Sequence, residues 1–153
     1  MAICQCLIST VVDNANGYAK ICVALIVRVR DEVSKADGIW IITPEYNYSY
    51  PGVLKNLLDW LSRPVMKGAP RTETAISGKK VTISGVGGKN ATASVRAKLK
   101  ELLQFMQVEL MEDKETGVAL DMSAFQTNIL DLSEENKESL QKQANAFLKF
   151  MEN

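Results

Sequence analysis

The segment from Ala36 to Arg63 constrains the fold of this chain more than any other stretch. It reads ADGIWIITPEYNYSYPGVLKNLLDWLSR, which is a short apolar run, a polar loop and then an amphipathic stretch. The run Ile39–Thr43 has the length and composition of a parallel strand that is buried on both faces. Pro51 suits a first helical turn, and leucines recur at helical spacing after it. The segment therefore predicts a strand, a loop and a helix in succession.

The same alternation continues along the rest of the chain. Apolar runs typical of strands lie at Met1–Val12, Lys80–Ser84 and Val108–Met111. Helical spacing of apolar residues predicts helices over Tyr18–Lys35, 51–63, Thr92–Met106 and 134–151. Strands that alternate with helices predict one α/β domain over all 153 residues, with a mostly parallel sheet and helices on both faces.

Ser133 marks the start of the last predicted helix. A serine N-cap followed by Glu134 and Glu135 satisfies free amides and complements the positive end of the helix dipole. One side of this helix is apolar, which predicts the side that packs on the sheet. That side consists of Leu140, Ala144, Phe147, Leu148 and Met151.

Two loops that follow predicted strands are the candidate binding elements. Right-handed crossovers place the carboxyl ends of parallel strands at one edge of a sheet, where open α/β sheets bind their ligands. Thr43–Tyr50 is rich in flat rings and short polar groups, which suits a planar heteroaromatic ligand. A capped turn with surface tyrosines explains the same composition. Ser84–Gly88 is rich in glycine, which permits either a tight turn or a close approach of backbone to a ligand.

The composition excludes several kinds of chemistry. The chain has no histidine, and so lacks the commonest general base near neutral pH and the commonest metal ligand. Lys plus Arg and Asp plus Glu number 18 each, which leaves no basic excess for nucleic acid. No stretch reaches the roughly 18–20 apolar residues of a membrane span. We therefore expect neither nucleic acid nor a membrane as a partner.

The three cysteines lie close together near the N-terminus, at Cys4, Cys6 and Cys22. An odd number of cysteines without a clear secretion signal predicts reduced thiols in a cytoplasmic protein. Their spacing fits no standard zinc or iron–sulfur pattern, so we expect no metal site.

The order of these pieces resembles the NADPH-dependent FMN reductase family, which includes chromate, quinone and azo-dye reductases. The resemblance rests on the strings PEYNYSYPGVLKN, DWLSR and SGVGG, and it extends from about Val29 to Asn153. It implies a flavodoxin-like fold, a three-layer sandwich with a parallel sheet, that binds FMN at the carboxyl edge of the strands. It also implies a homodimer or homotetramer.

The resemblance assigns two sets of residues to the flavin. One loop would hold the isoalloxazine ring, and the glycine-containing loop would lie along its pyrimidine side. These residues are Pro44, Glu45, Tyr46 and Asn47 in the first loop and Ser84, Gly85, Val86, Gly87 and Gly88 in the second. NAD(P)H would pass hydride to FMN, which would then reduce a quinone, an azo dye or another small electron acceptor. No catalytic side chain is required, which agrees with the absence of histidine.

Residues 1–28 depart from the pattern of the family. Family members begin with a strand and a Gly-Ser-x-Arg-x-x-Ser type loop that binds the FMN phosphate, and this chain shows no such loop. If Met1–Val12 served as the first strand, Ser9, Thr10, Asn14, Asn16 and Gly17 could offer some phosphate contacts, with Lys20 as the nearby cation. The absence of the arginine-containing loop favours the other reading, in which this portion is reduced or replaced. We therefore expect the first βαβ portion to be shortened. The alternative to an enzyme is a shortened scaffold that does not bind FMN tightly and acts through self-association or a partner.

Overall fold

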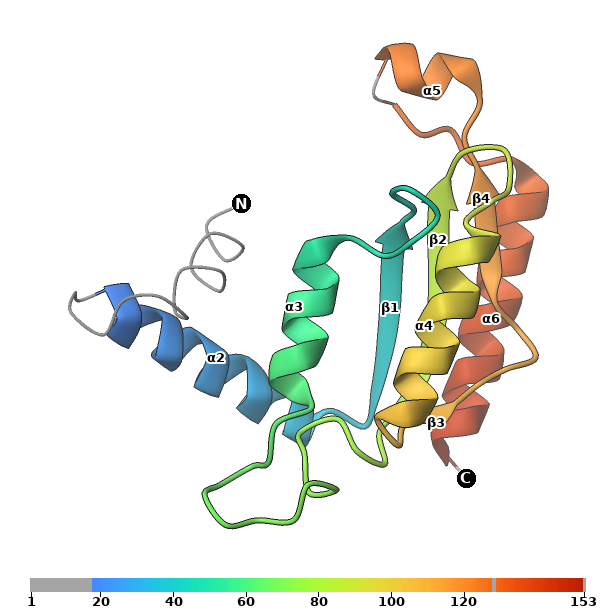
Figure 1. The fold of residues 1–153 in the computed structure, drawn as a ribbon. Coiled ribbons are helices and arrows are strands. Elements are labelled where there is room, and N and C mark those ends of the chain that lie inside the picture. Colours follow the sequence, from blue (N-terminus) through green and yellow to red (C-terminus); the bar gives the residue numbers. More distant parts are fainter. Residues whose placement is uncertain (1–17, 128, 153) are drawn as a thin grey trace. The chain divides into compact units, whose positions relative to one another are not determined.

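The computed structural model describes residues 18–127 and 129–152 (Figure 1). The elements in order are α2 (Tyr18–Lys35), β1 (Gly38–Pro44), α3 (Gly52–Leu61), β2 (Lys80–Gly87), α4 (Ala93–Phe105), β3 (Glu109–Leu110), β4 (Thr116–Ala119), α5 (Met122–Thr127) and α6 (Glu134–Glu152). They belong to two compact units. One unit contains α2 and α3, and the other contains the four strands with α4, α5 and α6.

The sheet of the second unit is parallel throughout and has β2 at its centre. β1 pairs with β2 from Gly38 opposite Lys80 to Pro44 opposite Val86. On its other side β2 pairs with β3 at its start and with β4 at its end, where Ser84 lies opposite Thr116. Among the described residues β1 pairs with β2 alone. The carboxyl ends of β1, β2 and β4 therefore meet at one edge.

Alternate residues of β2 face different helices. Val81 and Ile83 are fully buried on one face of the sheet. Gly85 and Gly87 lie on the same face, against the loop that leads into α4. The residues between them face α6, which lies on the opposite side of the sheet from α4 (Figure 1). The second unit is thus a three-layer α/β/α sandwich, as the fold prediction requires.

A buried glutamine joins α6 to the sheet. Gln143 is 1% exposed, and its Nε2 donates to Thr82 Oγ1 at 2.8 Å and to the Ile83 carbonyl at 2.9 Å. Its Oε1 accepts a hydrogen bond from Ser84 Oγ at 2.9 Å, and that hydroxyl also accepts one from Trp40 Nε1. Because each polar atom of the Gln143 side chain has a partner, the network stabilises the docking of α6 without leaving an unpaired buried group.

The first unit packs α2 against α3. From α2, the Arg30 guanidinium donates to the carbonyls of Arg63 and Pro64, directly after α3. Pro64 also forms an isolated bridge with Thr74. The connection from Val65 to Gly78 otherwise contains no helix or strand, as its polar composition predicts.

The predicted helices are confirmed to within two residues at each end. The N-cap prediction for α6 is also confirmed, because Ser133 Oγ accepts a hydrogen bond from the Asn136 amide at 3.2 Å. The strand predicted at Met1–Val12 lies outside the described residues.

Three local predictions are wrong. Strand β2 continues past Ser84 to Gly87, because its end pairs with β4. The last strand is β4, and the predicted strand Val108–Met111 is reduced to the two residues of β3. Leu148 is 57% exposed, while Gln143 is buried. The stripe of α6 that holds Gln143 faces the sheet because hydroxyls of β2 there offer it hydrogen-bond partners.

Candidate functional site

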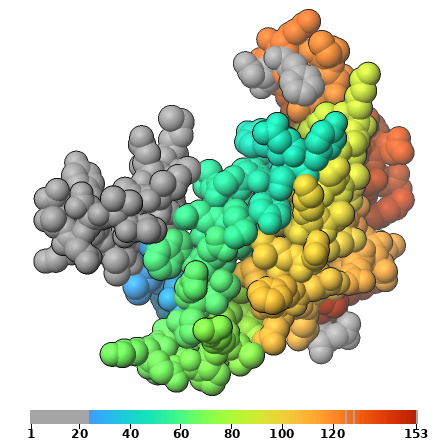
Figure 2. Space-filling view, in the orientation of Figure 1, coloured from blue at the N-terminus to red at the C-terminus, as the bar shows by residue number. Residues whose placement is uncertain are grey.

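The turn after β1 is a tight two-residue connection. Tyr46 and Ser49 exchange backbone hydrogen bonds of 2.9 and 3.0 Å. Between them, Asn47 and Tyr48 have positive φ angles of 51° and 59°. Two successive residues of this kind are typical of type I′ turns, and asparagine tolerates the conformation better than most residues. The turn therefore presents both side chains at the surface (cyan segment in Figure 2).

A cavity of about 420 Å³ lies at this edge of the sheet. It is lined by Glu45, Asn47 and Tyr48 after β1 and by Gly88, Lys89 and Asn90 after β2. Its volume is within the range of about 300–1,000 Å³ that small-molecule sites occupy. The lining combines a phenol ring, two carboxamides, a carboxylate and an ammonium group. This chemistry suits a flat ligand that is polar along one edge.

The cavity brings together part of the set that the family resemblance assigns to flavin, namely Glu45, Asn47 and Gly88. The sequence prediction included Tyr48 only as a member of its loop, and it missed Lys89 and Asn90. A cation and a carboxamide directly after paired glycines at a strand end are the signal that would have found them.

The glycines at the end of β2 make room for the loop before α4. A Cβ atom on Gly85 would lie 2.2 Å from Thr92 Oγ1, and one on Gly87 would lie 2.8 Å from Thr92 Cγ2. In β4, a Cβ atom on Gly117 would lie 2.0 Å from a backbone carbonyl oxygen of the same loop. None of these glycines has a left-handed φ, so the structure requires their lack of a side chain for space. Gly88, by contrast, has open space around its Cβ position.

The other residues assigned to flavin do not line the cavity. The Ser84 hydroxyl takes part in the Gln143 network on the α6 side of the sheet. Val86 is half-buried within β2, Pro44 ends β1 with an exposed ring, and Tyr46 is 61% exposed in the turn. A role for these residues in flavin binding stays a prediction.

The carboxylate of Glu45 connects the two sides of the cavity. Its Oε1 accepts a hydrogen bond from Asn90 Nδ2 at 2.7 Å, and its Oε2 accepts one from the Val95 backbone amide at 2.9 Å. Val95 lies in the first turn of α4, where the N-cap residue Thr92 makes no side-chain capping hydrogen bond. Glu45 therefore caps α4 from another part of the chain.

The surroundings of Glu45 favour its ionised form. Partial burial tends to raise the pKa of its carboxyl, but hydrogen bonds from Asn90, Val95 and Ser94 lower that pKa by more. The nearby Lys98 ammonium lowers the pKa further. The pKa of Glu45 consequently lies below its ordinary value, and the residue is a carboxylate at neutral pH.

A largely buried ion pair holds the loop before α4 from the side of β4. Arg96 Nη1 lies 3.2 Å from Glu115 Oε2, and the Glu115 side chain is only 6% exposed. Lys100 Nζ lies 3.1 Å from Glu115 Oε1, although not in hydrogen-bonding geometry. Arg96 also donates to the Ala91 carbonyl at 3.4 Å. Glu115 thereby fixes α4 and its entry loop against the start of β4.

We expect Glu115→Gln to lower the free energy of unfolding by about 1–3 kcal/mol, because Arg96 would stay largely buried without its counter-charge. Urea unfolding followed by circular dichroism measures the change. Glu112→Gln is the matched control, since the Glu112 carboxylate accepts only an exposed hydrogen bond from Gln104. The control should shift the unfolding free energy by less than about 0.5 kcal/mol. Equal losses in the two variants would contradict the role of the ion pair.

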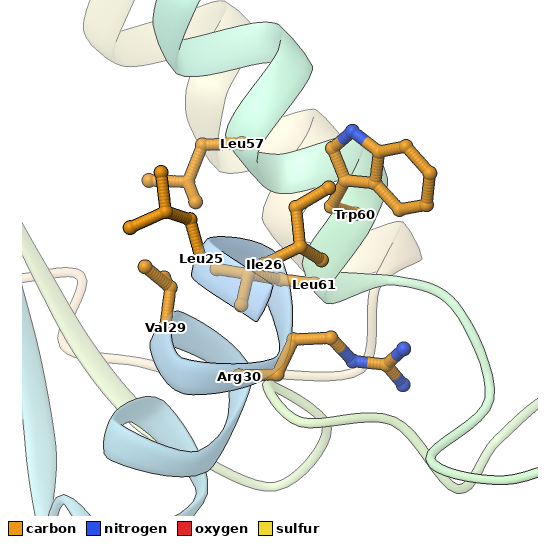
Figure 3. Close-up of a pocket in the computed structure, with 7 residues that line it drawn as sticks. All are labelled: Leu25, Ile26, Val29, Arg30, Leu57, Trp60 and Leu61. Atoms are coloured by element: carbon orange, nitrogen blue, oxygen red, sulfur yellow. The ribbon is translucent and has the colours of Figure 1, made fainter. Parts of the chain in front are cut away.

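A second, smaller cavity lies within the first unit, between α2 and α3. Its volume is about 40 Å³, and it is lined by Leu25, Ile26, Val29, Arg30, Leu57, Trp60 and Leu61. Figure 3 shows Leu25, Val29 and Leu57 gathered on one side, with the Arg30 guanidinium directed away from them. That guanidinium is already bound to the carbonyls after α3. The cavity is therefore a packing gap between helices and contributes no reactive group.

Other classes of site receive no support from the described part of the chain. It contains no group of three or more His, Cys, Asp or Glu side chains placed to bind a metal ion. It also contains no helix with the length and apolar character to cross a membrane. The side chains of Cys4, Cys6 and Cys22 lie outside the described residues, as do the predicted phosphate contacts.

Comparison with known proteins identifies relatives that cover most of this chain. It is 34% identical over 134 residues to an NAD(P)H-dependent FMN reductase of Pseudomonas aeruginosa, covering 87% of this chain and 69% of that protein. It is 35% identical over 113 residues to a 2-hydroxy-1,4-benzoquinone reductase of a Burkholderia species, covering 73% and 58%. The solved structure of FerB, a flavoenzyme NAD(P)H:(acceptor) oxidoreductase of Paracoccus denitrificans, matches with a TM-score of 0.68 and 29% identity over 83% of this chain and 67% of that one.

The family model described as NADPH-dependent FMN reductase matches residues 21–123. This range includes β1, β2, α4 and both sides of the cavity at the strand ends. The two relatives above extend beyond this chain, which spans 69% and 58% of their lengths. By sequence and by fold, the chain belongs to the NADPH-dependent FMN reductase family.

Proposed function

We propose that this chain is an FMN-dependent NAD(P)H oxidoreductase that reduces a quinone-type or other small acceptor. The observation that carries the proposal is the cavity of about 420 Å³ at the carboxyl ends of β1 and β2, in a chain of the FMN reductase family. The cavity would hold the isoalloxazine ring of FMN. The naming of one relative as a hydroxybenzoquinone reductase supports quinones as the acceptor class.

The cavity residues fit the shape of a flavin ring. Tyr48 is 69% exposed and offers a flat apolar surface. The exposed carboxamide of Asn47 offers both a donor and an acceptor, which matches the alternating polar atoms along the pyrimidine edge of the ring. Gly88 has open space around its Cβ position, so a ligand can approach the backbone closely there.

The charges around the cavity fit the chemistry that FMN supplies when bound, which is the acceptance and donation of hydride. Lys89 places a positive charge in the lining, and such a charge favours an anionic ligand or a ligand that becomes anionic on reduction. The negative charge of Glu45 is compensated by hydrogen bonds from Asn90 and α4. The chain therefore positions and stabilises the ligand without a catalytic acid or base.

We expect the purified full chain to quench the fluorescence of added FMN, and Gly88→Leu to raise the Kd for FMN at least about tenfold. The leucine side chain would enter the open cavity, where Gly88 has no neighbour within 4 Å of its Cβ position. Gln141→Leu on the exposed side of α6 is the control, and it should leave the Kd unchanged. Oxidation of NADH and NADPH with a benzoquinone as acceptor would then measure turnover.

Two outcomes would count against this proposal. A wild-type chain that does not quench FMN would overturn it and favour the alternative, a scaffold that acts through self-association or a partner. Tight FMN binding that Gly88→Leu leaves unchanged would place the flavin elsewhere.

The assembly state and location belong to the same proposal. The family resemblance supports a homodimer or homotetramer, which sedimentation velocity would distinguish from a monomer. A cytoplasmic location rests on the odd number of cysteines, and fractionation of cells that express the native protein would test it.

A further inference from the structure

We infer that Glu45 is a positioning residue of the flavin site, whose carboxylate holds the two sides of the cavity at a fixed spacing instead of binding the ligand. We name this arrangement the Glu45 latch and define it by Glu45, Asn90 and the Val95 amide. The inference rests on the proposed function, because the two sides that the latch connects are those proposed to hold the ring of FMN.

The two side chains of the latch, Glu45 and Asn90, belong to the two segments that line the cavity. Glu45 directly precedes the tight turn that presents Asn47 and Tyr48. Asn90 directly follows Gly88 and Lys89 on the other side. The hydrogen bond of 2.7 Å between Glu45 Oε1 and Asn90 Nδ2 thus fixes the distance between the two segments at the cavity itself.

Each end of the latch is held by further hydrogen bonds. Asn90 Oδ1 accepts one from the Thr92 amide at 3.3 Å, and Asn90 Nδ2 also donates to Ser94 Oγ at 3.3 Å. The second oxygen of Glu45 is held by the Val95 amide of α4. A change at Glu45 therefore releases the turn after β1 from α4 and from the loop after β2 at once.

The chemistry of the latch requires a carboxylate. All hydrogen-bond partners of Glu45 are donors, namely the NH₂ group of Asn90 and backbone N–H groups of α4. A glutamine at this position has one acceptor and one donor, so one of its terminal atoms would face a donor whichever way the amide is turned. Glu45→Gln therefore opens the latch with almost no change of side-chain volume.

The latch is also sensitive to acid. The charged groups near Glu45 are Lys98 of α4 and Lys89 of the cavity, and the titratable side chains of its own turn are Tyr46 and Tyr48. Since the pKa of Glu45 is lowered by folding, the latch is fully formed above the ordinary pKa of glutamate. It is lost as the pH falls through the lower pKa of the folded state.

The test compares FMN binding in the wild type, Glu45→Gln, Asn90→Ala and the double variant, by fluorescence quenching at neutral pH. We expect each single variant to raise the Kd about tenfold and the double variant to raise it about tenfold as well, since both remove the same connection. Glu112→Gln is the matched control, and its Kd should equal that of the wild type. Thermal unfolding of each variant separates loss of binding from loss of folded protein.

Two further measurements report on the latch directly. Deuterium uptake of the ligand-free protein should rise over residues 44–51 and 88–95 in Glu45→Gln, with no rise in the control. In a pH series, the ratio of the Kd of Glu45→Gln to that of the wild type should fall from about ten towards one as Glu45 is protonated. Taking this ratio at each pH cancels the protonation of the FMN phosphate.

The outcomes separate the latch from the proposed function. If the wild type binds FMN and Glu45→Gln binds it equally well, the latch is overturned and the proposed function stands. A double variant whose Kd rises about a hundredfold would make Glu45 and Asn90 independent ligand contacts and would also overturn the latch. A wild type that does not bind FMN overturns the proposed function, and the latch as a flavin-positioning device falls with it.

Discussion

Replacing Gly117 with alanine should lower the free energy of unfolding by about 3 kcal/mol or more. The new Cβ atom would lie 2.0 Å from the Ala91 carbonyl oxygen and 2.7 Å from Arg96 Nη2. The arginine side chain can move, but the carbonyl belongs to the backbone of the loop before α4. Relief of the overlap therefore requires β4 and this loop to separate, which loses close packing on the face of the sheet that α4 covers.

Differential scanning calorimetry and urea unfolding measure this effect. A loss of about 3 kcal/mol corresponds to a Tm lower by roughly 6–12 °C in a chain of this size. Gly88→Ala is the matched control, because the Cβ atom meets nothing within 4 Å there and the backbone φ is ordinary. The control should change the unfolding free energy by no more than about 0.5 kcal/mol. A Gly117→Ala variant as stable as this control would disprove the close approach of the loop to β4.

Gln143→Leu should be the second severe substitution, with a loss of about 2–4 kcal/mol in the free energy of unfolding. The leucine side chain fills much of the same space, so the loss comes from polar groups left without partners. Thr82 Oγ1 and the Ile83 carbonyl would lose a donor, and the Ser84 hydroxyl would lose its acceptor. All of these groups lie between β2 and α6, where water does not replace the missing bonds.

The matched control for this variant is Gln141→Leu on the exposed side of the same helix. It removes only an exposed hydrogen bond to Asn145 and should shift stability by less than about 0.5 kcal/mol. Combining Gln143→Leu with Thr82→Val should be less destabilising than the sum of the single variants, because each removes a partner of the other. Additive losses would show that the glutamine contributes mainly through packing.

The helices were predictable because their signals are local. The bounds of α2, α4 and α6 follow from apolar residues at helical spacing and from end signals such as Ser133. The strand β1 was predictable for the same reason. A short apolar run between polar segments is typical of a strand in a chain that alternates helix and strand.

The strand ends and the buried polar network were not predictable from local pattern. Gly85 and Gly87 are typical of a loop in sequence, yet they lie inside β2 because that end of the strand pairs with β4. Their lack of a side chain leaves space for the loop before α4. Gln143 has the polarity of a surface residue, and it is buried because β2 places two hydroxyls opposite it. Both outcomes depend on segments distant in the sequence.

The candidate site shows the same division. The strings around Asn47 and Gly88 predicted a site at the carboxyl edge of the sheet, and the structure has a cavity at that edge. Lys89 and Asn90 were missed, because their local sequence marks them only as polar residues after glycines at a strand end and does not show that the segment turns back toward the loop after β1. The resemblance assigned Glu45 to the flavin, and that role stays a prediction. The structure shows in addition that the Glu45 carboxylate is bound to α4 and Asn90.

The sequence by itself determined the α/β class, the positions of the helices and the family. These follow from the periodicity and order of residues along the chain. Only the tertiary structure decided that Glu45 caps α4, that Ser84 faces α6 and that Gly117 must lack a side chain. The physical reason is that spacing along a strand sets which residues share a face. The atoms that pack against that face belong to segments distant in the sequence, and local pattern does not specify which of these segments approach it.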